Sequence, residues 1–145
     1  MSQLKRKINL VIASSALVLL TGCSTLTNLY DAYFMAGYDT NEYGLITKIR
    51  THAELNVGMC DDQAVSKNTF DYLHYKSTEF KNFSQYIPKN ENAYKLSEQI
   101  VELTKQGKDM YSKSDSVSAG FCKLKLQQIS RSAESIQKVI GSKTR

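Results

Sequence analysis

Apolar residues recur three or four positions apart in four stretches of the chain, which is the spacing of one face of an α-helix. These stretches cover residues 39–60, 61–87, 90–110 and 122–140. The first begins with the cap-forming sequence Asp39-Thr40-Asn41-Glu42, and Pro88 stops the second. Residues 111–116 are expected to form a polar linker, whose Asp or Ser caps the last helix.

No stretch of five or more residues shows the alternation of a β-strand, and the connections between the helical stretches are short. Short connections favour antiparallel neighbours. The sequence therefore predicts an all-α fold, an antiparallel up-down four-helix bundle in residues 41–145. The expected seams are, in chain order, Ile46, Ile49, Ala53, Val57 and Cys60; Phe70, Leu73, Phe80, Phe83 and Ile87; Ala93, Leu96, Ile100, Leu103, Gly107 and Met110; and Cys122, Leu126, Ile129, Ala133, Ile136 and Ile140.

The start of the chain has a different pattern. Residues 1–7 carry three basic residues and no acid, and residues 8–20 form a mostly apolar run. This order is typical of an export signal. The run is shorter than the roughly 20 apolar residues that a membrane span needs, and polar residues interrupt it. Residues 1–22 are therefore expected to be a cleaved signal helix.

The apolar run ends in Leu20-Thr21-Gly22-Cys23, which resembles the lipobox of bacterial lipoproteins. The resemblance implies cleavage before Cys23, a diacylglycerol thioether on its thiol and a fatty acid, such as palmitate, on its freed amine. Several acyl chains on one residue hold a protein at a membrane almost permanently. Ser24, where enterobacterial lipoproteins kept in the inner membrane have Asp, implies the outer membrane, facing the periplasm. The alternative is an ordinary signal peptide or anchor with an incidental cysteine.

Residues 23–40 are expected to be a lipidated N-terminal segment. A short helix against the bundle or near the lipid surface is favoured there over a disordered tether, because the segment contains several aromatic residues. Cys60 and Cys122 remain as a pair in a compartment that permits disulfides. They lie at one pole of an up-down bundle, on neighbouring helices, so a bridge between them is favoured. A zinc site lacks the usual ligand spacing, and a catalytic thiol lacks an evident base.

The formal net charge of +5 comes from 19 basic and 14 acidic residues. Three basic residues belong to residues 1–22, so the remainder has a net charge of +2. Residues 23–62 carry a net charge of −4, and residues 123–145 carry +5. Either the first and last helices complement each other, or the basic end approaches anionic lipid, lipopolysaccharide or a partner. The residues concerned are Lys138, Lys143 and Arg145. Nucleic acid is not expected as a partner outside the cytoplasm.

Catalytic patterns are weak in this sequence. His52 and His74 are expected at the edge of the core, outside any metal-binding motif, and a hydrolase that uses them is the least favoured class. The adjacent acids Asp61-Asp62 fit a helix start better than a metal site. We therefore expect no enzyme activity, metal or cofactor. Among nine tyrosines, those at 72, 75 and 86 lie off the seam, and Tyr is enriched at interfaces.

These features predict a non-enzymatic, membrane-anchored periplasmic lipoprotein that binds another envelope protein, with Tyr72, Tyr75 and Tyr86 as the interaction face. Secretion-system pilotins resemble this plan of a helical bundle with a cysteine bridge, in architecture alone. Phage or plasmid lipoproteins for exclusion or lysis are comparable. The alternative is a groove between helices that holds a lipid, haem or a cell-wall fragment.

Overall fold

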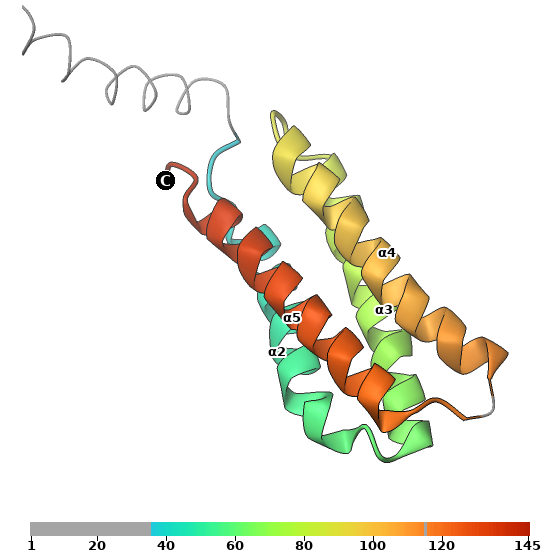
Figure 1. Ribbon diagram of the computed structural model, residues 1–145. Helices are drawn as coiled ribbons and strands as arrows, with labels where there is room; N and C mark the ends of the chain where they lie inside the picture. The colour runs from blue at the N-terminus through green and yellow to red at the C-terminus, as the bar shows by residue number, and fades with distance from the viewer. Residues whose placement is uncertain (1–35, 115) are drawn as a thin grey trace, which may run out of the picture. The chain divides into compact units, whose positions relative to one another are not determined.

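The computed structural model describes residues 36–114 and 116–145, and four long helices account for most of them (Figure 1). The helices are α2 (Thr40–Asn56), α3 (Gln63–Gln85), α4 (Glu91–Lys113) and α5 (Ala119–Gly141), with a short 3-10 helix, η1 (Val57–Met59), after α2. No strand occurs in the described residues. The all-α prediction is therefore confirmed for this part of the chain. The predicted signal helix, the lipobox and the N-terminal segment up to residue 35 lie outside the described residues.

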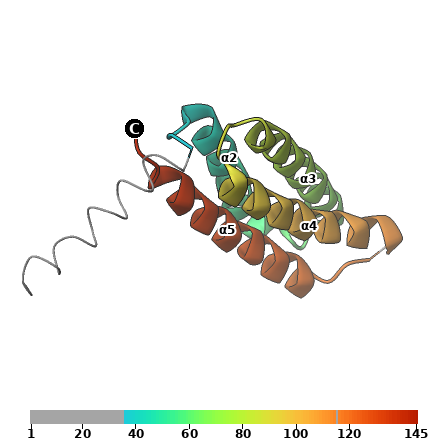
Figure 2. The same ribbon diagram turned by 90° about the horizontal axis from the view of Figure 1, so that it is seen from above.

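Each helix packs against the next one along the chain, and α5 returns to pack against α2. Figures 1 and 2 show α2 beside α5 and α3 beside α4, with these two pairs forming the bundle. The short connections reverse the chain direction each time, so neighbouring helices are antiparallel. The up-down four-helix bundle is confirmed.

Side-chain caps fix where three of the helices begin. The Asp39 carboxylate accepts hydrogen bonds from the first N–H groups of α2, at 2.8 and 2.9 Å. Asp62 caps α3 by accepting from the Val65 N–H at 2.9 Å, which confirms the predicted helix-start role for the second acid of the Asp61-Asp62 pair. Ser118 caps α5 through the Phe121 N–H at 3.2 Å. Each cap satisfies backbone donors that have no partner within the helix.

The predicted linker at residues 111–116 begins too early. The α4 helix continues to Lys113, and the Tyr111 ring is buried against Phe70 with ring centroids 5.4 Å apart. Burial of this aromatic ring favours another helical turn over the looping tendency of its polar neighbours.

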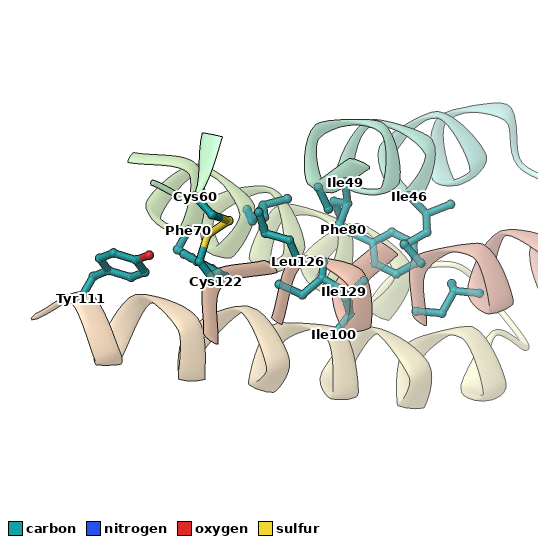
Figure 3. Close-up of a cluster of buried hydrophobic side chains, with 14 of the residues drawn as sticks. Ile46, Ile49, Cys60, Phe70, Phe80, Ile100, Tyr111, Cys122, Leu126 and Ile129 are labelled. Atoms are coloured by element: carbon teal, nitrogen blue, oxygen red, sulfur yellow. A yellow bond between two sulfur atoms is a disulfide. The ribbon is translucent and has the colours of Figure 1, made fainter. Parts of the chain in front are cut away.

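One cluster of buried apolar side chains fills the space between the four helices (Figure 3). All six seam positions predicted for α5 are buried, and so are all those predicted for α2 except Val57, which lies in η1. The fully buried large residues are Ile46, Ile49, Phe70, Leu73, Phe80, Ile100, Leu126, Ile129, Ile136 and Ile140. This core holds the surface grooves between the helices in fixed positions.

The buried face of α4 includes Ala93, Ile100 and Gly107, as predicted, but is rotated away from the other three predicted positions. Ser97 and Thr104 are fully buried, whereas Leu96 and Leu103 are half-buried and Met110 is exposed. The hydroxyls cost little to bury because they bond within their own helix: Thr104 Oγ1 donates to the Ile100 carbonyl at 3.0 Å. Small hydroxyl residues thus let α4 approach its neighbours closely.

The Cys60–Cys122 disulfide joins the end of η1 to the first turns of α5, with the Cα atoms 5.6 Å apart (Figure 3). Both cysteines are fully buried within the core. The predicted pairing is confirmed, and the zinc-site and catalytic-thiol alternatives for these two residues are excluded. Burial keeps solution thiols away from the bond, so the disulfide serves as a structural link.

Gly107 provides a first test of the packing. A Cβ atom at this position would lie 2.3 Å from Phe70 Cδ1, inside the packed core. We expect Gly107→Ala to destabilise the protein by about 1–3 kcal/mol through overpacking, despite the better helix propensity of alanine. Urea unfolding followed by circular dichroism measures this. The matched control is Gly120→Ala in α5, where a Cβ meets nothing within 4 Å and stability should stay the same or rise.

Candidate functional site

A groove lined by aromatic and aliphatic side chains runs between α2 and α3 and contains two hollows. The first, of about 470 Å³, is mostly apolar; the second, of about 240 Å³, lies further along α2. Both are open to solvent. The first is lined by Leu45, Glu79, Asn82, Phe83, Tyr86 and Ile87, and the second by Thr47, Lys48, Thr51, His52, Leu55 and Tyr72. We refer to these two hollows and the surface between them as the α2–α3 groove.

The three tyrosines singled out from the sequence share one side of α3, because positions 72, 75, 79, 82 and 86 repeat at helical spacing. Tyr86 is 82% exposed and lines the first hollow, and Tyr72 lines the second. Tyr75 is 62% exposed on the same side, with Lys76 Nζ 5.2 Å from its ring centroid. Sequence reasoning did not identify the α2 half of the groove, in which Leu55 is 73% exposed.

The two histidines lie at the edge of the core, as predicted. His52 packs against the Tyr72 ring with centroids 4.1 Å apart, and burial lowers its pKa below the ordinary value. His74 faces Thr104 on α4, and its pKa is also lowered, mainly by burial and further by the nearby Lys108. In both cases the lowered pKa favours the neutral imidazole, and no hydrogen bond joins either ring to a carboxylate among the described residues.

A group of buried polar side chains, which the sequence did not reveal, lies at the pole of the bundle where α2 begins and α5 ends; this is the upper pole in Figure 1. Glu42 on α2 and Lys143, just after α5, form an ion pair of 2.6 Å, with exposed fractions of 0% and 6%. Asn90 donates to Glu42 Oε1 at 2.6 Å and accepts from Lys143 Nζ. Ser84 donates to the same Glu42 oxygen at 2.8 Å. We refer to these four residues as the buried polar cluster.

The buried polar cluster holds three chain segments together. Glu42 belongs to the first turn of α2, Ser84 and Asn90 flank the α3–α4 connection, and Lys143 follows α5. Two backbone hydrogen bonds connect the same regions of the chain. The Ala36 N–H donates to the Lys89 carbonyl at 3.0 Å, and the Tyr38 N–H donates to the Thr144 carbonyl at 2.9 Å. The α3–α4 connection also carries Tyr86 and Ile87 of the first hollow. The cluster therefore fixes one end of the α2–α3 groove.

Of the three basic residues predicted to approach lipid or a partner, Lys143 is ruled out by its burial, whereas the contact stays a prediction for the exposed residues Lys138 and Arg145. Lys143 is buried against Glu42 and is not available to a lipid head group. Lys138 pairs with Glu134 at 2.7 Å, and the Arg145 guanidinium lies 5.2 Å from the Tyr38 ring centroid. Charge complementarity between the first and last helical regions appears at the lower pole, where Lys123 lies 3.8 Å from Asp61.

In the part of the chain that the structure describes, no cluster of three or more histidine, cysteine or acidic residues could hold a metal ion. None of the described helices combines the length and apolar character needed to cross a membrane. Comparison with known proteins finds no matching family model, curated protein or solved structure. Function is therefore inferred from the groove and from the sequence alone.

Proposed function

We propose that the protein is a lipid-anchored, non-enzymatic accessory factor of the cell envelope, and that its helical bundle binds another envelope protein. Cys23 is the proposed lipid attachment site, and the outer membrane facing the periplasm is the proposed location. The lipobox sequence supports the anchor. The disulfide supports an oxidising compartment, because such bonds persist outside the cytoplasm.

The observation that carries the binding function is the α2–α3 groove. Exposed aromatic and aliphatic side chains are gathered along it, including Tyr86, Tyr72 and Leu55. Single exposed apolar residues are common, but exposed apolar residues gathered at two neighbouring hollows, with aromatic members, are typical of protein interfaces. Because the core and the disulfide make the groove rigid, a partner would meet a preformed surface at little entropic cost.

The proposed anchor also limits where a partner is found. Residues 24–35 separate Cys23 from the first described residue, Ala36. Even fully extended, this length of chain spans at most about 45 Å. The bundle would thus work close to the membrane surface.

A groove that holds a lipid, haem or cell-wall fragment is the alternative function. The first hollow is large enough and apolar enough for a small ligand. It is open along its side, however, whereas small-molecule sites usually bury most of the ligand surface. A partner protein, which covers a groove without being enclosed by it, fits this open site better than a small ligand does.

The anchor is tested by replacing Cys23. We expect Cys23→Ser to abolish incorporation of labelled palmitate and to leave residues 1–22 uncleaved by the lipoprotein peptidase. Metabolic labelling and mass spectrometry of the producing cells measure both. The control is the Cys60→Ala/Cys122→Ala protein, which should still be labelled. Unchanged labelling of Cys23→Ser would refute the lipoprotein assignment.

The binding function is tested by removing the groove aromatics together. We expect the Tyr72→Ser/Tyr86→Ser protein to give at least tenfold less chemically crosslinked complex with its envelope partner than the wild type gives. Aromatic residues that become buried in an interface usually contribute most of its binding energy. Leu124→Ser, at an exposed apolar position on α5, should crosslink like the wild type. Equal crosslinking by all three proteins would remove the groove from the proposed function.

A further inference from the structure

The chemistry of the α2–α3 groove limits what can occupy it. Its walls are regular helices, whose backbone N–H and C=O groups are bonded within each helix. The described residues contain no strand, so they offer no sheet edge to which an extended peptide could add. An extended peptide lying here would leave its own backbone groups without partners on the groove side. A helix satisfies its own backbone and needs only side-chain contacts.

We infer that the α2–α3 groove accepts one amphipathic α-helix of a partner protein, which packs as a fifth helix along the bundle. This inference rests on the proposed binding function and specifies the partner element. The helix presents an apolar ridge to the groove and carries at least one acidic residue toward Lys48.

The positions of the two hollows set the spacing of that ridge. Along α2 they are centred near Leu45 and His52, about 10 Å apart, and along α3 near Phe83 and Tyr72, about 16 Å apart. A helix rises about 1.5 Å per residue, so large apolar residues of the occupant fall about 7 to 11 positions apart. Positions i, i+7 and i+11 share one helix face, so one straight helix reaches both hollows.

The charge of Lys48 is the reason to expect an acidic residue on the partner helix. Lys48 is exposed on the rim of the second hollow and has no ion-pair partner among residues 36–114 and 116–145. In the first hollow, Glu79 is already engaged by Lys76 at 2.6 Å. The groove therefore presents one uncompensated cation, which a carboxylate on the bound helix would neutralise.

The test places the photocrosslinking residue p-benzoylphenylalanine at position 86 or position 72 of the full-length protein in the cells that produce it. The crosslinked peptides are then mapped by mass spectrometry. We expect both positions to react with one segment of one partner, at sites about 14 residues apart, because positions 72 and 86 are separated by that number of residues along α3 and its C-cap. An acidic residue should lie between apolar positions at helical spacing. The same residue at position 124 on α5 is the background control.

A charge reversal completes the test. Lys48→Glu should lower crosslinking from position 72 about two- to fivefold, the range of an exposed ion pair. Lys95→Glu, an exposed lysine on α4, is the matched control and should change nothing.

The other outcomes separate the inference from the proposed function. Crosslinks to a partner segment of strand-like alternation, or to two unrelated segments, would overturn the helix inference and leave partner binding in place. Crosslinks to residues 24–35 of the same chain, to a second copy or to lipid would assign the groove to that occupant instead of a partner helix. No crosslink above the position 124 control would overturn both the inference and the proposed use of the groove.

Discussion

The Lys143→Met variant is expected to be about 3–5 kcal/mol less stable than the wild-type protein, because it leaves the Glu42 carboxylate buried without its cation. Methionine fills a similar volume, so loss of charge rather than loss of packing dominates the effect. Urea unfolding followed by circular dichroism measures the free energy of unfolding. Lys138→Met, which removes an exposed lysine one turn earlier, is the matched control and should change little.

A double variant distinguishes the buried pair from simple side-chain packing. Glu42→Gln/Lys143→Met removes both charges and keeps an amide that can accept the hydrogen bonds from Ser84 and Asn90. We expect it to be more stable than Lys143→Met alone, because no unpaired charge remains buried. Purely additive losses would show that the two charges do not depend on each other. Hydrogen exchange should also rise at the α3–α4 connection in Lys143→Met, since Asn90 loses the hydrogen bond from Lys143 Nζ, and Glu42, which accepts from both Ser84 and Asn90, loses its cation.

The sequence predicted the parts of the fold that depend on local periodicity. The α5 seam was correct at every position, because six apolar residues at helical spacing leave one face to bury. The α4 seam was rotated because periodicity counts Ser97 and Thr104 as polar, whereas each hydroxyl bonds to a carbonyl of its own helix. The end of α4 was missed because the polar residues after Tyr111 concealed the burial of its ring.

The candidate sites also differ in how far the sequence could predict them, depending on whether they follow from helix topology or from contacts between distant segments. The disulfide could be predicted because an up-down topology brings the ends of two helices to one pole. The buried polar cluster could not, since Glu42 contacts residues 42, 48 and 101 positions away in the chain. In the sequence Glu42 resembles an ordinary first-turn acid and Lys143 an ordinary surface lysine. Only the packing of three separate segments turns them into a buried pair.

The Cys60→Ala/Cys122→Ala protein is expected to lose about 4 kcal/mol of stability, because the bridge closes a loop of 62 residues and so restricts the unfolded chain. Urea unfolding of both proteins without reductant measures the difference. Brief exposure of the folded wild type to reductant should leave the bridge intact, because both sulfurs are buried, whereas reduction in urea should bring its stability to that of the double variant. Equal stability of the oxidised wild type and the double variant would show that the helices hold this pole without the covalent link.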